Sequence, residues 1–117
     1  MKPITSYQQL IVWQKSFDLS VMIYKICQQL PKSETYGIIS QMQRSAVSIP
    51  SNIAEGYDRR SRKEYISFLR IALGSSAELE TQLLICEKVY QLPITDSVNQ
   101  LTEVRKILYT IIKKLTP

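Results

Sequence analysis

The chain has 117 residues, of which 15 are basic and 10 are acidic, so its formal net charge is +5. Three glycines and five prolines are too few for an all-β protein, which needs a turn roughly every ten residues. The sequence contains no histidine, which removes the commonest general base, the usual serine and cysteine triads and the ligands of di-iron bundles. Composition therefore predicts one helical domain over residues 1–117 and argues against an enzyme.

The two cysteines, Cys27 and Cys86, lie inside apolar helical patterns. They are expected to be small buried side chains, because neither belongs to a spaced disulfide or metal framework. No apolar run approaches the ~18 residues needed to cross a bilayer, and the N-terminus lacks the core of a signal peptide. We expect a soluble protein in a reducing cytoplasm, with no metal or cofactor.

Residues 7–30 form the first predicted helix, because apolar side chains recur at intervals of three and four. These positions are Leu10, Trp13, Phe17, Tyr24 and Cys27, and the apolar face is widened by Val12, Leu19, Ile23, Ile26 and Leu30. Pro31, Lys32 and Ser33 end this helix. Ser33 is the predicted N-cap of the next helix, with Glu34 favourably placed in its first turn.

The second predicted helix runs from Ser33 to about Glu55 and contains Pro50 in its interior. An interior proline removes one backbone hydrogen bond and costs about 3 kcal/mol, so we expect a kink between Ala46 and Pro50. The kink has two interpretations: a bend that wraps the helix around its neighbours, or an exposed Ala46 carbonyl used in recognition. The first is favoured, since prolines kink helices without any ligand. Gly56 is predicted to close the helix in the left-handed conformation.

A capping-box pattern at Ser61 to Glu64 predicts the start of a third helix. From Tyr65 the core positions follow a seven-residue repeat. They are Leu69, Ala72, Ser76, Leu79, Leu83, Cys86 and Tyr90. Further apolar side chains lie beyond this seam, more than one facing helix would cover, so burial on two sides is expected.

Pro93 is predicted to stop the third helix, and Thr95 or Asp96 to cap a fourth. Apolar residues of the fourth helix recur at threes and fours from Val98 to Leu115. The connections at 31–33 and 92–95 are short, which favours antiparallel neighbours. The expected fold is all-α, an antiparallel up-down four-helix bundle with a proline-kinked second helix.

Two motifs on the second and third helices carry a resemblance to a known family. The residues are Gln41, Arg44, Ala46, Ser48-Ile49-Pro50 and Asn52-Ile53-Ala54-Glu55-Gly56, then Phe68-Leu69, Ile71-Ala72, Gly74-Ser75, Glu78-Leu79 and Glu80-Thr81. Together they resemble the 23S rRNA intervening-sequence proteins, and the match spans nearly the whole chain.

The resemblance implies a small bacterial protein that assembles into a ring-shaped homopentamer. Some members of this family are encoded within insertions in large-subunit ribosomal RNA genes. A distant relative is the accessory subunit of the reverse transcriptase in diversity-generating retroelements, a basic pentamer that binds nucleic acid. The resemblance therefore implies the chain itself as one partner and RNA or a ribonucleoprotein as another.

The positive charge is concentrated between the second and third helices. Residues 59–70 hold five basic side chains and one acidic side chain, a local charge of +4, which leaves +1 for the remainder. A basic cluster has the wrong sign for a helix N-terminus, whereas bound phosphate would satisfy both the dipole and the arginines. The candidate nucleic-acid-binding residues are Tyr57, Arg59, Arg60, Arg62, Lys63 and Arg70.

Each of these residues also has a simpler interpretation. The basic side chains are equally explained as a solubilising corner of an isolated subunit. Tyr57 either stacks on an unpaired base or packs on its own bundle, as a tyrosine beside a helix end more often does.

The remaining motif residues are expected to be structural. They are Gln41, Arg44, Ser48, Pro50, Asn52, Glu55, Gly56, Gly74, Ser75 and Glu78. Glu55 and Glu78 are expected to pair with Arg44 or to cap polar groups inside the bundle. Gln41, Ser48, Asn52 and Ser75 are expected to form interhelical hydrogen bonds around the kink.

The sequence thus predicts a non-enzymatic, homo-oligomeric basic bundle that binds RNA or a ribonucleoprotein through its second inter-helix turn. The alternative is a protein-interaction scaffold, in which the first and third helices carry assembly and the basic turn meets an acidic protein. A retroelement-accessory role is a special case of the first hypothesis. The neighbouring genes would distinguish it from an rRNA insertion.

Overall fold

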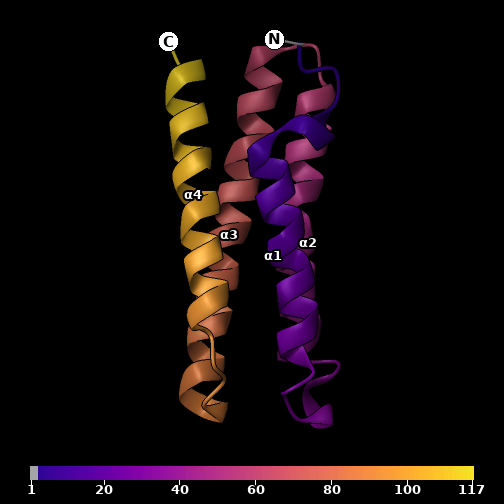
Figure 1. Cartoon of the computed structure of the whole chain (residues 1–117), viewed down its shortest axis with the longest axis vertical. Coiled ribbons are helices and arrows are strands. Elements are labelled where there is room, and N and C mark those ends of the chain that lie inside the picture. Colours follow the sequence, from indigo (N-terminus) through magenta and orange to yellow (C-terminus); the bar gives the residue numbers. More distant parts are fainter. Residues whose placement is uncertain (1–2) are drawn as a thin grey trace.

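Four α-helices pack side by side in a computed structural model of the chain, which describes residues 3–117 (Figure 1). The helices are α1 (Ile11–Cys27), α2 (Ile38–Asp58), α3 (Arg62–Tyr90) and α4 (Thr95–Leu115), with short 3-10 helices η1 (Tyr7–Gln9) and η2 (Lys32–Glu34). Residues 3–117 contain no strand, and none of their helices is long and apolar enough to cross a membrane. The predicted all-α bundle of four helices is confirmed.

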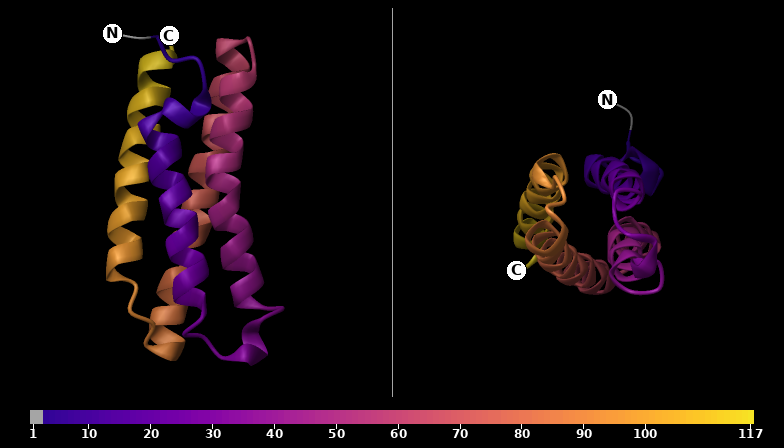
Figure 2. Two further views of the ribbon diagram at one scale, coloured as in Figure 1. Left: turned by 45° about the vertical axis from the view of Figure 1, so that its right-hand side comes forward. Right: turned by 90° about the horizontal axis from the view of Figure 1, so that it is seen from below.

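Each helix contacts two neighbours, so the bundle is a four-cornered ring of helices in end view (Figure 2). The pairs in contact are α1 with α2, α2 with α3, α3 with α4, and α4 with α1. The molecule measures 45 × 26 × 23 Å. The turn between α2 and α3 lies at the same end as the C-terminus of α4 (Figure 1).

Aliphatic side chains from all four helices fill the core. The fully buried large side chains are Leu19, Ile23, Met42, Ile49, Ile53, Leu69, Leu79, Leu83, Leu101, Leu108, Val12 and Val104. The seven-residue repeat of α3 is confirmed at its six central positions, Leu69 to Cys86. In α1 the prediction was partly wrong, because Phe17 and Tyr24 are about half exposed, each at 48%.

The first helix is shorter than residues 7–30. Leu10 has an extended backbone, which separates η1 from α1. A capping box holds η1 instead: Gln8 N–H donates to the Ser6 hydroxyl, and Ser6 N–H donates to the Gln9 side-chain oxygen. This local alternative explains why the helical pattern around Tyr7 does not continue directly into α1.

Ser33 does not cap the second helix. It lies within η2, and α2 begins at Ile38 after Gly37, whose backbone angles are φ −109° and ψ −118°. The Glu34 carboxylate accepts a hydrogen bond from the Tyr90 hydroxyl, so this carboxylate ties the connection to the end of α3. That contact also raises the pKa of Tyr90, because the neutral hydroxyl is the donor.

Gly56 does not end α2 in a left-handed conformation. The helix continues through Gly56 to Asp58, and no glycine in the described chain has a positive φ. Gly56 is buried against α3, and a Cβ there would lie 2.6 Å from the Cβ of Phe68. The glycine is explained by this close approach and not by turn geometry.

The remaining helix ends agree only in part with the predictions. The Ser61 hydroxyl accepts the Glu64 N–H at 3.2 Å and so caps α3 as predicted. The third helix ends before Pro93, with Gln91 in the left-handed conformation at φ 54°. The N-cap of α4 is Ile94, so Thr95 and Asp96 lie within the first turn and provide no cap.

The Ala46 carbonyl, which loses its helical partner because residue 50 is a proline, has a partner on α1. Pro50 is buried, and the Ser20 hydroxyl donates to the Ala46 oxygen at 3.0 Å. The carbonyl is therefore satisfied inside the molecule, and its predicted alternative role as an exposed recognition group is wrong. The predicted bend of α2 at this proline stays a prediction.

Replacing Ser20→Ala should destabilise the protein by about 1–3 kcal/mol, because it leaves the Ala46 carbonyl buried without a donor. In a Pro50→Ala background the same change should cost much less, since residue 50 then supplies a helical N–H to that carbonyl. Urea denaturation of the four proteins of this double-mutant cycle measures the coupling.

Ser16→Ala is the matched control for this cycle. The Ser16 hydroxyl donates to the Trp13 carbonyl within its own helix, so its loss leaves that carbonyl with its ordinary helical partner. Equal costs of Ser20→Ala in the proline and alanine backgrounds would contradict the assignment.

Gly56→Ala should lower the free energy of unfolding by about 1–3 kcal/mol, despite the better helix propensity of alanine, because the new methyl group overlaps the Phe68 Cβ. Gly74→Ala is the control, since a Cβ at that position meets no atom within 4 Å. It should leave stability unchanged or raise it by up to about 1 kcal/mol. If both variants were equally stable, the close α2–α3 approach would be wrong.

Candidate nucleic-acid interface

The predicted basic residues lie at one end of the bundle, around the turn between α2 and α3. We call this the basic corner: Tyr57, Arg59, Arg60, Arg62, Lys63 and Arg70. All five basic side chains are exposed. Arg62 and Lys63 are the first two residues of α3, so their charges stand at the positive end of a helix dipole.

Arg59 is held by its own chain. Its guanidinium lies 3.7 Å from the Glu55 carboxylate and 3.9 Å from the Glu64 carboxylate, and it covers the Phe68 ring at 5.1 Å from the centroid. Two carboxylates therefore offset much of its charge. Glu64 thus makes two contacts at the start of α3. Its backbone N–H donates to the Ser61 hydroxyl, and its carboxylate pairs with Arg59.

Arg60, Arg62, Lys63 and Arg70 form no ion pair with a carboxylate within residues 3–117. Lys63 and Arg70 are seven residues apart, so they share a face of α3. Arg60, Arg62 and Lys63 lie at the N-terminus of α3, where the backbone N–H groups of the first helical turn also favour an anion.

Tyr57 packs within its own chain. Its hydroxyl donates to the Ile4 carbonyl at 3.1 Å, and its ring meets Tyr65 edge to face with centroids 6.1 Å apart. These contacts attach the segment before η1 to the end of α2. The packing interpretation of Tyr57 accounts for what is observed, and its stacking on a base stays a prediction.

Two lysines that sequence analysis did not single out lie at the same end of the molecule. Lys113 and Lys114 lie in the last turn of α4, and α4 ends at the same end of the bundle as the α2–α3 turn (Figure 1). Both side chains are exposed. Their position could be inferred only from the order of the helices, because 42 residues of sequence lie between Arg70 and Lys113.

The polar residues of the family motif connect α2 to α3. The hydroxyls of Ser48 and Ser75 are 2.8 Å apart, and Asn52 donates to the Ser48 hydroxyl at 2.9 Å. Farther along the same contact, the Ser45 hydroxyl donates to the buried Gln82 side-chain oxygen at 2.8 Å. The predicted interhelical hydrogen bond is thus confirmed for Ser48 and Ser75, whereas Asn52 donates only to Ser48 within its own helix, α2.

The predicted ion pairs of Arg44 are absent from residues 3–117. Glu55 contacts Arg59 instead, and Arg44, Gln41 and Glu78 are exposed on the outer faces of their helices. Gln41 has no side-chain hydrogen bond within the same part of the chain, so its predicted interhelical bond is wrong. These three side chains point away from the bundle because they lie opposite the buried positions of α2 and α3.

The cysteines are buried and free. Burial raises the pKa of the Cys27 thiol to about 11 and also raises that of Cys86, so both stay protonated near neutral pH and are poor nucleophiles. Among residues 3–117 no three histidine, cysteine, aspartate or glutamate side chains are grouped to hold a metal ion. The arrangement offers anion-binding groups at one end and apolar helix faces along the sides.

Comparison with known proteins places the chain in a family. Residues 8–113 match the family model of the 23S rRNA-intervening sequence protein. The chain belongs to this family. A solved structure that resembles it is a protein of unknown function from the S23 ribosomal protein family of Bacteroides thetaiotaomicron, with 30% sequence identity and a TM-score of 0.79 over 88% of this chain and 99% of the other. A comparison with curated proteins found no match.

Arg59→Ala should lower the free energy of unfolding by about 0.5–1 kcal/mol, because it removes two solvent-exposed ion pairs and a cation–π contact. Arg60→Ala should leave stability unchanged within about 0.5 kcal/mol, since substitutions of exposed residues without such contacts have little effect. Denaturant titrations at low and high salt check this, and the Arg59 effect should shrink with salt. Equal effects of the two substitutions would argue against a structural role for Arg59.

Proposed function

We propose that this protein is a non-catalytic, homo-oligomeric bundle that binds RNA through its basic corner. The observation that carries the proposal is the group of exposed cations without carboxylate partners at the N-terminus of α3, namely Arg60, Arg62 and Lys63. Lys113 and Lys114 add positive charge at the same end. The family name, which refers to 23S rRNA, supports RNA as the polyanion.

Phosphate fits this corner better than a protein carboxylate does. The basic side chains are spread over two turns of α3 and the preceding loop, so they can contact successive phosphates along a backbone. Individual contacts with exposed arginines are weak, and their number determines the affinity and its salt dependence. A homo-oligomer multiplies the number of corners available to one RNA.

The proposed assembly is a ring of copies of an up-down bundle with a bend at Pro50. The exposed apolar residues on the sides of α1 and α3 support association of copies, because contiguous apolar side chains on a helix face are typical of interaction surfaces. These faces also support the alternative function, a protein-interaction scaffold whose basic corner meets an acidic protein. The first function requires that the protein bind RNA through the basic corner, whereas the scaffold function does not.

Neutralising the corner with Arg60→Gln, Arg62→Gln and Lys63→Gln should greatly weaken binding to a fluorescently labelled single-stranded RNA. The logarithm of affinity should fall with the logarithm of salt concentration in the wild type. In the triple variant this slope should be smaller by about 2 per subunit that contacts the RNA, because three phosphate contacts are lost at ~0.7 each. Fluorescence anisotropy across a salt series measures both quantities.

The matched control removes the same charge at the other end of the bundle, with Lys25→Gln, Lys32→Gln and Lys88→Gln. These side chains are exposed, and Lys25 and Lys88 lie in the last turns of α1 and α3. RNA binding and its salt slope should stay close to wild type in this control. Equal losses in the two triple variants, or binding that salt does not weaken, would refute the proposal.

A further inference from the structure

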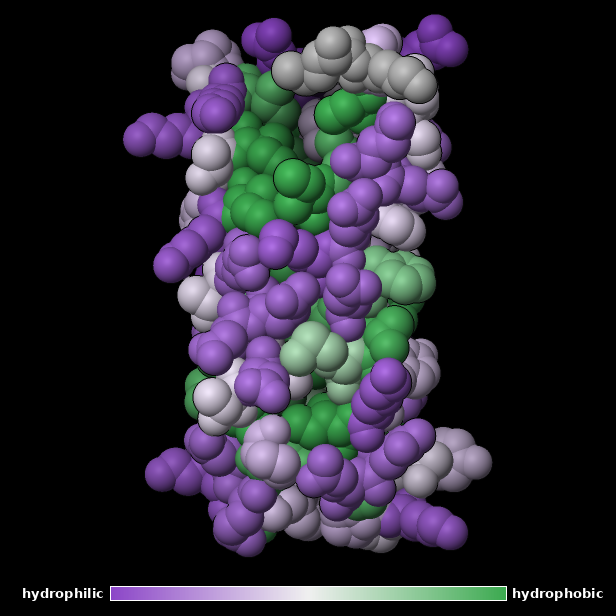
Figure 3. All heavy atoms as spheres, viewed as in Figure 1, coloured by the Kyte–Doolittle hydropathy of each residue, from purple (hydrophilic) through white to green (hydrophobic). Residues whose placement is uncertain are grey.

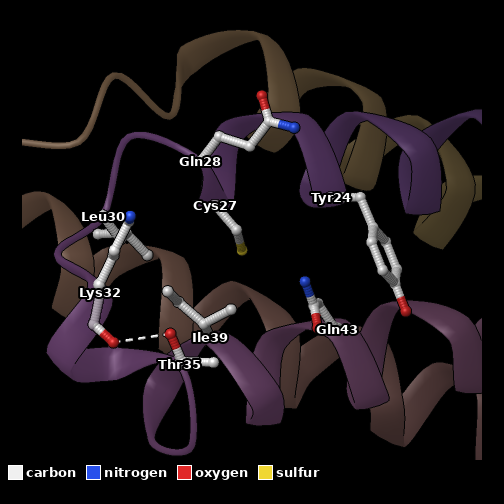
Figure 4. A pocket seen from close by; sticks show the side chains of 8 residues that line it. All are labelled: Tyr24, Cys27, Gln28, Leu30, Lys32, Thr35, Ile39 and Gln43. Carbon is white, nitrogen blue, oxygen red and sulfur yellow. Dashed lines mark hydrogen bonds between the residues drawn. The ribbon is translucent and has the colours of Figure 1, made fainter.

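A groove runs along the outer side of the bundle between α1 and α2. It consists of three hollows of about 320, 530 and 360 Å³ in order from the η1 end. The first two share Val47 and Ser51, and the last two share Tyr24 and Gln43, so the hollows are continuous. Figure 4 shows the last hollow, with Tyr24 on α1 and Gln43 on α2 at its side.

The groove has an apolar wall and two exposed cations, Arg44 in the central hollow and Lys32 in the hollow nearest η2. Trp13, Phe17 and Tyr24 form its α1 side, and Phe17 and Tyr24 are each 48% exposed. Arg44 lies on the α2 side of the central hollow and forms no ion pair within residues 3–117. The groove follows α1, a helix of 17 residues that is about 25 Å long. A groove of this length suits a docked helix better than a small molecule.

The outer side of α3 presents a matching ridge. Ile71, Glu78 and Ile85 are spaced seven residues apart and so lie in one line along the helix. Ile71 and Ile85 are about half exposed, and Leu84 and Val89 widen the apolar patch at the C-terminal half. Glu78 is exposed in the middle of this line and, like Arg44, pairs with no cation in the described chain.

The groove of a chain cannot be filled by its own ridge. In the bundle α3 contacts α2 and α4 but not α1, and α1 and α3 stand at opposite corners in end view (Figure 2). Two different complementary surfaces on one chain make a heterologous contact, in which each copy offers its ridge to the groove of the next. Figure 3 shows a further apolar area over α1 and α4.

We propose that the α1–α2 groove is the docking site for the outer ridge of α3 of a second copy of this chain, with Arg44 paired to the Glu78 of that copy. This inference rests on the homo-oligomer in the proposed function and specifies its contact surface. The charge pair fixes the register of the two helices, and the apolar side chains on either side of it supply the buried area.

The first test is a charge swap followed by light scattering. The wild type should have a mass that is a multiple of 13.5 kDa. Arg44→Glu and Glu78→Arg should each shift the mass toward that of one chain, because each puts two like charges in contact. The double variant Arg44→Glu with Glu78→Arg should recover the wild-type mass, and Arg60→Glu at the basic corner should keep it.

The second test uses Trp13, which is the only tryptophan and lines the groove. Acrylamide should quench its fluorescence weakly in the wild type, more strongly in each single variant, and weakly again in the double variant. Unchanged far-ultraviolet circular dichroism in the single variants shows that loss of mass reflects lost association and not unfolding.

The outcomes separate this inference from the function on which it rests. A wild-type oligomer whose mass and quenching are unaffected by Arg44→Glu and Glu78→Arg overturns the proposed contact and leaves the oligomer in place. A wild type that stays at the mass of one chain at every concentration overturns both. RNA binding that persists in the dissociated single variants, with a reduced salt slope, supports the contact and the basic corner independently.

Discussion

The close packing of α2 on α3 is the constraint on which the candidate RNA-binding surface depends. Gly56 has no side chain, which lets α2 come within contact distance of Phe68. Phe68 in turn lies beneath the guanidinium of Arg59, and Arg59 bridges carboxylates from both helices. The packing of Gly56, Phe68 and Arg59 therefore determines the shape of the turn between α2 and α3. The exposed cations of the corner are carried on a rigid support, which is what a binding surface requires.

The other sides of α2 make different contacts. Toward α1, Ser20 supplies the hydrogen bond that Pro50 cannot, so the proline interrupts the helical ladder without leaving a buried carbonyl unpaired. Toward α3, short polar side chains such as Ser48 and Ser75 bond to each other across a narrow contact. Only the outermost side of α2, which carries Arg44, is left for a partner.

Short-range patterns in the sequence predicted those features that depend on neighbouring residues. The seven-residue repeat of α3 and the Ser61 cap were both predictable in this way. The errors fell where distant residues decide the outcome. Glycine at position 56 suits a helix end and a close helix contact equally well, and only Phe68, twelve residues farther on, distinguishes them. Ser33 was a plausible cap, but Gly37 and the bond from Tyr90 to Glu34 place the helix start at Ile38.

The sequence predicted where the positive charge of the candidate site lies, but not which of its side chains form ion pairs. Counting charges located the basic corner, but it could not show that Arg59 is engaged by two carboxylates, or that Lys113 and Lys114 join the same end. The expected partners of Arg44 also proved to lie elsewhere, which left a cation and an anion exposed on different sides of the bundle.

The two proposals concern different parts of the surface: RNA binding involves one end of the bundle, and association of copies involves its sides. The groove and the ridge both run along the helices, so copies joined through them stand side by side with their ends uncovered. Repeated rotation about an axis parallel to the helices keeps the corner of every copy at the same end of the assembly. RNA would then meet several copies of Arg60, Arg62 and Lys63 on one face. Affinity would rise with the number of copies while each contact stayed weak and sensitive to salt.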